Sequence, residues 1–207
     1  MQKLLGVTEQ AVVVSIVLHL GTTLALVIFF FKDILNLLRS IRLISYIIIV
    51  TLVTGIIGVS GKGFFERLFY SPRLVAVALI VTGLILIITK KSMEAKRNVL
   101  NTKDAFILGL TQGFAIIPGI SRSGITVSTL LFRGIDRETC FRFSFIASIP
   151  AVLGAAILEA KDISLTCNMD FNNLIAGFIV SLLTGILALK ILKIILGKAK
   201  LHYFGYY

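Results

Sequence analysis

Residues 105–132 read AFILGLTQGFAIIPGISRSGITVSTLLF, and Arg122 is the only charged residue in this run. A membrane-spanning helix needs about 20 apolar residues at 1.5 Å each to cross about 30 Å of hydrocarbon. A run of 28 residues is therefore too long for one ordinary span and too short for two spans joined by a turn. It predicts a different kind of element, which the residues at its middle define.

The middle of this run contains Pro118 and Gly119. Proline removes a backbone donor and the glycine next to it tolerates unusual dihedral angles, so a helix that arrives from Phe106 should break there. Non-helical backbone at membrane depth survives only where protein or a wet cavity satisfies its polar groups. We therefore predict two half-helices that form a re-entrant hairpin over about 105–132, with Pro118 in a structural role.

The rest of the chain has the composition of a membrane protein. Of its 207 residues, 57% are apolar and 15% are charged, and the mean hydropathy is +0.99, whereas soluble domains have about 45–50% apolar and about 25% charged residues. These values exclude a soluble globule and a disordered chain, and two cysteines exclude a disulfide scaffold. The excess of 21 Lys and Arg over 10 Asp and Glu indicates cytoplasmic loops and anionic headgroups rather than nucleic acid.

Five further windows lack Asp, Glu, Lys and Arg over a length that approaches or reaches a membrane span: 11–31, 43–61, 74–89, 143–158 and 174–189. We predict an all-α integral membrane protein with about five transmembrane helices plus the re-entrant hairpin. Residues 1–207 then form a single polytopic membrane domain.

Loop charges predict the orientation of these helices. Four segments carry three to five Lys or Arg each: 32–42, 90–104, 133–142 and the tail after residue 189. The loop 161–173 carries one, so the positive-inside rule places it outside and the four basic segments inside. Residues 105–132 must then enter and leave the membrane on the same side. This requirement supports the hairpin independently of the Pro-Gly break. Loop 62–73 is an exception, since it falls outside with three positive residues.

Two short matches indicate an internal repeat. Residues 52–57 (LVTGII) resemble residues 182–187 (LLTGIL) at an offset of 130, and residues 32–34 match residues 161–163 at an offset of 129. Chance and duplication both explain such matches among Leu, Ile and Gly. If the duplication is real, halves of about 11–61 and 143–196 belong to an inverted-repeat architecture, which is common in transporter-like folds.

The chemistry of the sequence is concentrated at the predicted break, where hydroxyls, a cation and glycines gather: Gly119, Ser121, Arg122, Ser123, Gly124 and Thr126. This set suits a phosphate, because a guanidinium binds two oxygens and the N-terminus of the second half-helix adds donors. Function is the default hypothesis for an intramembrane arginine, because its burial is costly. The alternative is an arginine that snorkels or pairs structurally near a helix end.

Other polar residues are weaker candidates. Gln112 lies one and a half turns before Pro118, and we leave open whether it faces the site. His19 is expected to make a structural hydrogen bond inside the bundle, and Glu9 to be a solvated or helix-start carboxylate rather than a displaced catalytic acid. The sequence contains no metal-ligand cluster, P-loop, dinucleotide fingerprint or nucleophile elbow, so no metal-ligating residue is predicted.

The run PGISRSGIT at residues 118–126 resembles the second signature of the undecaprenyl-diphosphate phosphatase family, also called bacitracin-resistance proteins. Gln112-Gly113 before it and Phe143-Ser144-Phe145 to Pro150 after it are similar to the family pattern. The similarity extends through Leu18-His19-Leu20-Gly21-Thr22 and His202-Tyr203-Phe204. The resemblance implies an inverted repeat of helices with two re-entrant hairpins.

The resemblance also implies an activity: hydrolysis of the C55 isoprenyl diphosphate to its monophosphate at the bacterial plasma membrane, which recycles the lipid carrier of cell-wall synthesis. Arg122 would hold the diphosphate and neutralise developing charge, Ser121 would hydrogen-bond or help activate at the phosphoryl centre, and Thr126 would support the pocket. The expected substrate-binding residues are Gly119, Ser123, Gly124 and Gln112. The expected partners are this polyprenyl lipid and membrane lipids, not nucleic acid, and a homodimer is left open. The alternative function is a transporter or flippase that binds a phosphorylated polyprenyl lipid without hydrolysis.

The sequence departs from the family pattern at both ends. The family uses an N-terminal signature with two Glu residues and a Ser-Ser-Thr-Gly-His run, associated with a divalent cation (Mg or Ca) and with the nucleophile or base. This sequence begins MQKLLGVTE, which resembles the stretch after that signature, and it ends in the aromatic run YFGYY. We therefore expect a chain that is truncated at both ends, lacks the carboxylate ligands of the expected cation and is impaired in hydrolysis.

Overall fold

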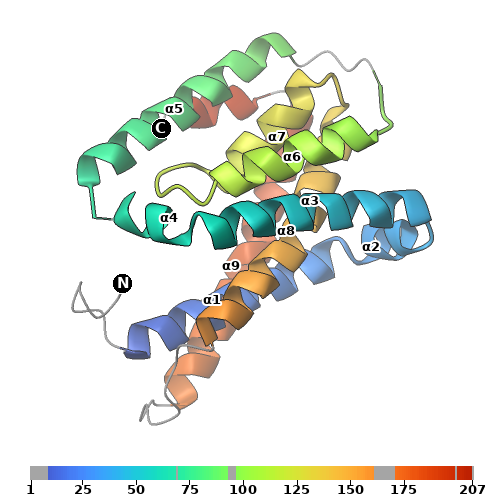
Figure 1. The fold of residues 1–207 in the computed structure, drawn as a ribbon. Helices are drawn as coiled ribbons and strands as arrows, with labels where there is room; N and C mark the ends of the chain where they lie inside the picture. The colour runs from blue at the N-terminus through green and yellow to red at the C-terminus, as the bar shows by residue number, and fades with distance from the viewer. Residues whose placement is uncertain (1–8, 69, 93–96, 161–170, 199, 207) are drawn as a thin grey trace.

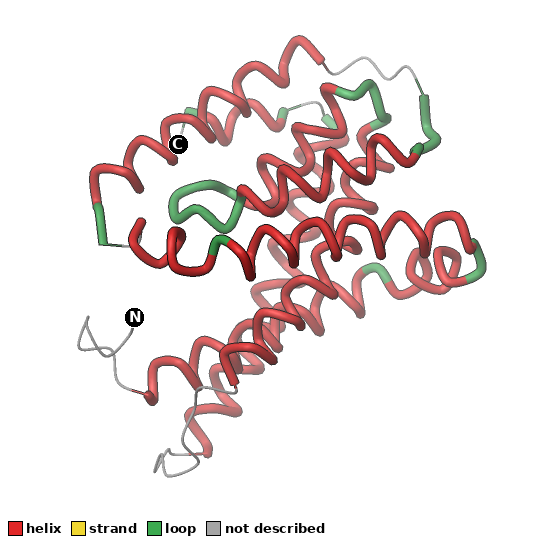
Figure 2. The backbone as a smooth tube through the Cα atoms, in the orientation of Figure 1, coloured by secondary structure: helices red, strands yellow, loops and turns green. Residues whose placement is uncertain are grey.

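The computed structural model describes residues 9–68, 70–92, 97–160, 171–198 and 200–206. They form nine α-helices and two short 3₁₀ segments (Figure 1): α1 Glu9–Phe29, α2 Phe31–Leu38, α3 Ile41–Ser60, α4 Lys62–Leu68, α5 Pro72–Ile88, η2 Thr89–Ser92, α6 Thr102–Phe114, α7 Arg122–Phe132, α8 Arg137–Ala160, α9 Phe171–Gly197 and η3 Leu201–Gly205. Within these ranges the tube in Figure 2 contains helices and loops only, which confirms the predicted all-α class.

The apolar helices are those of a multi-pass membrane protein. Three of the described helices, α3, α8 and α9, are long and apolar enough to cross a bilayer. Helices α1 and α2 form a pair bent by 72°, which is a fourth candidate span, and α5 is an apolar helix of 17 residues. Each predicted window thus contains a helix, although α8 begins before its window, at Arg137, and α9 continues beyond its window through Lys190 and Lys193.

Helices α6 and α7 form the predicted hairpin, and the loop 115–121 joins them (Figure 1). With 13 and 11 residues, neither helix is long enough to cross about 30 Å of hydrocarbon. The start of α6 and the end of α7 lie side by side. Asp104, in the first turn of α6, forms an ion pair at 2.9 Å with Arg133, which follows α7. The hairpin therefore enters and leaves at one end of the molecule, as the loop charges predict.

The basic segments that the structure describes gather at that same end, which we call the basic end. Arg42 at the start of α3 donates to the carbonyl of Leu100 just before α6, at 3.1 Å. Arg137 at the start of α8 donates to the carbonyl of Gly197 at the end of α9, at 3.2 Å. These contacts confirm that segments 32–42, 97–104, 133–142 and the end of α9 share one side, which is the arrangement predicted for the cytoplasmic loops.

Glycines let the hairpin approach α3 closely. A Cβ atom at Gly109 would lie 2.8 Å from Cβ of Val53, and one at Gly113 would lie 2.6 Å from a methyl group of Ile57. The spacing of these glycines, four residues apart on α6, is typical of close helix pairs in membranes. The first arm of the hairpin is therefore packed against α3, and the tip loop extends beyond it toward α5.

The remaining helices form a bundle of α1, α8 and α9, with α1 and α9 in the most extensive contact (Figure 1). Gly21 of α1 faces Ser181 of α9 so closely that a side chain at position 21 would collide with the Ser181 hydroxyl. The prediction that His19 makes a hydrogen bond inside the bundle is wrong: its side chain is exposed, and its ring bonds at 2.9 Å to the carbonyl of Ser15 in its own helix. The predicted repeat halves, 11–61 and 143–196, stay a prediction.

Candidate functional site

The helix break lies where proline and glycine predict it. Helix α6 ends at Phe114, and the chain then makes tight turns in which Ile117 N–H donates to Phe114 O at 3.1 Å and Ile120 N–H donates to Ile117 O at 3.1 Å. Because Pro118 has no N–H, the α-helical ladder cannot continue through it. The loop instead turns back, and α7 begins four residues after Pro118.

Gly119 has a backbone conformation that few other residues adopt. Its φ is +92°, and a Cβ atom at this position would collide with the carbonyl oxygen of Val75 on α5. The loop therefore lies directly against the backbone of α5, which only a glycine permits.

Replacing Gly119 by alanine should lower the stability of the protein by about 1–3 kcal/mol, because the loop must leave α5 and adopt a strained φ. The thermal unfolding midpoint in detergent is the measurement. Gly154→Ala is the matched control, since a Cβ atom at Gly154 in α8 has nothing within 4 Å. Equal midpoints for Gly119→Ala and the wild type would contradict this account of the loop.

Thr82 of α5 holds the start of the second half-helix in place. Its buried hydroxyl donates to the carbonyl of Ala78 at 3.0 Å and accepts from Ser121 N–H at 3.3 Å. Ser121 is the N-cap of α7, and its Oγ accepts from Gly124 N–H at 3.2 Å. A hydroxyl at an N-cap position satisfies one of the otherwise unpaired amides of the first turn, so the local sequence explains why α7 begins here.

The first turn of α7 offers donors to a ligand. The amides of Arg122 and Ser123 are the first-turn groups that an α-helix leaves without intrahelical partners. The guanidinium of Arg122 is half-buried and has no hydrogen-bond or ion-pair partner among the residues that the structure describes. A permanent cation, two amides without intrahelical partners and the positive end of a helix dipole together favour an anion with several oxygens, such as a phosphate.

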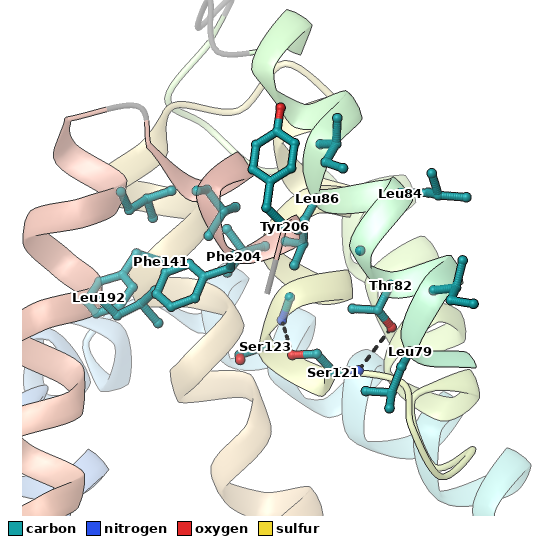
Figure 3. Close-up of a pocket in the computed structure, with 18 of the residues that line it drawn as sticks. Leu79, Thr82, Leu84, Leu86, Ser121, Ser123, Phe141, Leu192, Phe204 and Tyr206 are labelled. Carbon is teal, nitrogen blue, oxygen red and sulfur yellow. Dashed lines mark hydrogen bonds between the residues drawn. The ribbon is translucent and has the colours of Figure 1, made fainter. Parts of the chain in front are cut away.

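A cavity of about 1110 Å³ opens beside this turn. Ser121, Ser123 and Gly124 line it from α7, and Thr82 lines it from α5 (Figure 3). The remaining lining is mostly apolar and comes from α5, α9 and η3, together with Val127 of α7, Phe141 of α8 and Tyr206, whose ring carries a hydroxyl. Arg122 itself is not among the lining residues, because successive residues of a helix point about 100° apart.

Two predicted site residues lie in other surroundings. Thr126 is buried, with 1% of its surface exposed, and its hydroxyl donates to the carbonyl of Arg122 at 2.8 Å. Gln112 is also buried, and its Nε2 donates to Oγ1 of Thr54 on α3 at 3.2 Å, while its Oε1 has no partner among the residues that the structure describes. Thr126 thus supports the first turn of α7, and Gln112 joins the hairpin to α3. Pro118, Gly119, Ser121, Ser123 and Gly124 all lie in the tip loop or the first turn of α7.

The base of the hairpin holds a buried ion cluster that sequence reasoning did not single out. Asp104 is fully buried and accepts from Arg97 at 2.6 and 2.7 Å, from Arg133 at 2.9 Å and from the amide of Asn101 at 2.9 Å. Burial by itself raises the pKa of Asp104, but the hydrogen bonds from Arg97, Asn101 and Arg133 outweigh it and hold the pKa below its ordinary value. The available signal was the Asn101-x-x-Asp104 spacing of a capping box, which the structure contains.

The described residues do not fit the divalent cation that the family resemblance implies. They contain no group of three or more His, Cys, Asp or Glu side chains placed to hold a metal ion. The cavity beside α7 has no carboxylate among its lining residues. Hydroxyls alone are poor ligands for Mg²⁺ or Ca²⁺, which take carboxylate, carbonyl and water oxygens.

Comparisons with known proteins agree with the sequence pattern. A family model described as "Bacitracin resistance protein BacA" matches residues 1–207. A protein of Carboxydothermus hydrogenoformans named undecaprenyl-diphosphatase is 41% identical over 100% of this chain and 82% of its own length. Proteins with the same name from Alkaliphilus metalliredigens and Thermotoga petrophila are 38% and 40% identical, over 100% and 92% of this chain and 84% and 78% of their own lengths.

Proposed function

The chain belongs to the bacitracin resistance protein BacA family, and we infer that it hydrolyses undecaprenyl diphosphate to undecaprenyl phosphate and inorganic phosphate at the first turn of α7. The relatives described above are named for this hydrolase. The observation that carries the assignment to α7 is the guanidinium of Arg122, which lies at a helix N-terminus inside a membrane protein and has no partner among the described residues. We also propose that the chain lies in the bacterial plasma membrane, because its lipid substrate is recycled there.

The reaction transfers the terminal phosphoryl group of the lipid to water. The bond between the terminal phosphorus and the bridging oxygen breaks, and a bond from the water oxygen to phosphorus forms. The bridging oxygen leaves with the lipid monophosphate, and the proton that the attacking water loses passes to solvent. Catalysis of such a transfer depends mostly on positioning and on stabilising charge. The groups at α7 can supply both.

Each group at the turn has a distinct role. Arg122 binds two oxygens of the diphosphate and neutralises the charge that develops on the bridging oxygen. The free amides of Arg122 and Ser123 bind oxygens of the terminal phosphate, and the hydroxyls of Ser121 and Ser123 donate to the same groups. Thr126, which bonds to the Arg122 carbonyl, holds the backbone of this turn in its helical geometry.

The divalent cation expected from the family remains a proposal without a ligand set among the described residues. The roles above therefore use only groups of this chain. A homodimer likewise stays an open expectation.

Phosphate release tests the proposed function. Purified chain in detergent, supplied with undecaprenyl diphosphate in buffers with and without Mg²⁺ or Ca²⁺, should release inorganic phosphate at a rate above that of empty detergent. The same protein in proteoliposomes, with labelled lipid in one leaflet, provides the contrasting measurement. Movement of the lipid between leaflets without phosphate release would contradict hydrolysis and support the transporter alternative.

A further inference from the structure

We propose that α2 is an interfacial helix, which lies in the plane of the membrane and binds the headgroups of anionic phospholipids at the basic end. The proposal concerns a surface away from α7 and goes beyond the proposed function. Its test measures depth and lipid contact in a bilayer, so the result does not depend on whether the chain releases phosphate.

Helix α2 leaves the direction of α1 at a sharp bend. Helix α1 has 21 residues, which at 1.5 Å each reach about 31 Å, so α1 can cross the hydrocarbon without α2. The angle between the two helices is 72°, and spanning helices tilt by only about 20° on average. Helix α2 therefore lies close to the membrane plane, in contact with α3 at the basic end (Figure 1).

Aromatic packing and an ion pair hold α2 at this angle. Phe30, at the bend, is buried, and its ring centroid lies 4.9 Å from that of Phe29 and 5.2 Å from that of Phe141 on α8. Asp33 of α2 pairs with Arg142 of α8 at 3.3 Å. The bend is therefore part of the packed structure, and α2 has a defined orientation relative to the bundle.

One exposed face of α2 is apolar. Phe31, Leu35 and Leu38 are 55%, 42% and 58% exposed. At about 100° per residue, these three side chains lie within about 60° of one another around the helix. Leu37, in contrast, is buried in the core on the side of α2 that faces the protein. The exposed apolar stripe is what a helix in the membrane plane needs to enter the acyl region.

A second exposed face of α2 is basic. Lys32 and Arg39 are seven residues apart, so their side chains lie within about 20° of each other around the helix. Both side chains are exposed and form no ion pair with the residues that the structure describes. Asp33 is the only acidic residue of α2, and it pairs with Arg142. Two cations without a counter-charge beside an apolar stripe favour anionic over zwitterionic headgroups.

The first experiment measures depth. The chain contains no tryptophan, so a single introduced tryptophan reports the depth of a chosen position. Phe31→Trp and Leu38→Trp place it at the two ends of the apolar stripe. In vesicles with lipids brominated at known depths, the two positions should differ in depth by less than about 5 Å, whereas a helix along the membrane normal separates them by about 10 Å.

Helix α3 provides the matched control for depth. Leu52 and Val59 are also seven residues apart, and they are 58% and 66% exposed. Because α3 is long and apolar enough to cross the bilayer, Leu52→Trp and Val59→Trp should differ in depth by about 10 Å.

The second experiment measures lipid preference with the Leu35→Trp protein, whose tryptophan lies in the middle of the stripe. In vesicles of equal parts phosphatidylglycerol and phosphatidylcholine, bromine on phosphatidylglycerol should quench its fluorescence at least about threefold more strongly than bromine on phosphatidylcholine, because each cation near the surface attracts anionic lipid. Adding Lys32→Gln and Arg39→Gln should bring this ratio close to one.

The matched control for lipid preference removes two other cations. Arg67 and Arg73 are exposed, and they lie after the far end of α3, away from the basic end. Adding Arg67→Gln and Arg73→Gln to the Leu35→Trp protein should therefore leave the quenching ratio unchanged.

Three results would overturn the proposal. A depth difference above about 5 Å between Phe31→Trp and Leu38→Trp would mean that α2 continues the span of α1. Equal quenching by the two brominated lipids in the Leu35→Trp protein would mean that this surface does not select anionic headgroups. A quenching ratio that Lys32→Gln and Arg39→Gln do not change would mean that these two cations do not bind the lipid.

Discussion

Arg122→Ala should lower the rate of phosphate release from undecaprenyl diphosphate by about 100- to 1000-fold, the range found when one preorganised donor is removed from a phosphoryl or acyl transfer site. The guanidinium has no partner among the described residues, so its loss breaks no internal ion pair. Folding should therefore survive while the bidentate contact to the lipid diphosphate is lost. The measurements are phosphate release and binding of the same lipid in detergent, together with the thermal unfolding midpoint.

Two further variants test whether the effect of Arg122→Ala is specific to the guanidinium at this position. Arg122→Lys keeps the charge but loses the planar fork, so it should recover part of the affinity and little of the rate. Arg39→Ala removes an exposed arginine from the α2–α3 turn, at the basic end, and should have no effect on either quantity. An Arg122→Ala protein that binds the diphosphate with wild-type affinity would remove Arg122 from the site.

Asp104→Asn should destabilise the protein by about 3 kcal/mol, the usual cost of removing one partner from a buried ion pair. Asp104 has no exposed surface, and its replacement leaves Arg97 and Arg133 close together without a counter-charge. Because this ion cluster joins the two ends of the hairpin, the loss of stability should appear as unfolding of α6 and α7 at a lower temperature than in the wild type. The thermal midpoint and hydrogen exchange of the hairpin amides measure it.

The pH dependence of stability provides an independent check on Asp104. Its pKa is lowered in the folded protein, so the carboxylate contributes stability above its ordinary pKa of about 3.9, and this contribution is lost as pH falls through the lower folded value. The wild type should thus lose its advantage over Asp104→Asn at acid pH. Asp33→Asn is the control, because its 3.3 Å pair with Arg142 is partly exposed and should contribute at most about 1 kcal/mol. A constant difference between wild type and Asp104→Asn down to strongly acid pH would contradict the assignment.

The positions of the helices were predictable because membrane helices follow from composition and length. The windows 43–61 and 74–89 contain α3 and α5 with small shifts at their ends, since a bilayer allows few alternatives to a helix. Pro118 and Gly119 likewise predicted the break between α6 and α7 through rules that act within a few residues. The bend of 72° between α1 and α2 was not predicted, because no proline or glycine is present at Phe30 and the bend depends on how neighbouring helices pack.

The candidate site was predicted in part. Ser121, Arg122 and Ser123 are adjacent in sequence, so one helix turn brings them together without help from the rest of the fold. Thr82, which holds the amide of Ser121, is 39 residues away and looks like an ordinary polar residue in an apolar helix. Gln112 and Thr126 have the residue types of a binding site, but their neighbours on α3 and α7 decide that their side chains bond inside the protein.

The sequence by itself determined that this is an α-helical membrane protein, where its helices break, and that an arginine with hydroxyls lies at one break. These properties depend on the backbone preferences of neighbouring residues and on the free energy of transferring apolar side chains into hydrocarbon. Neither of these requires tertiary contacts. Only the tertiary structure decided that α5 holds the tip loop, that Asp104 closes the hairpin between two arginines, and that α5 and α9 enclose an apolar cavity beside the site. Those features depend on contacts between segments far apart in the chain. Many pairs of apolar helices are compatible by sequence, and only close packing selects the pairs that are in contact.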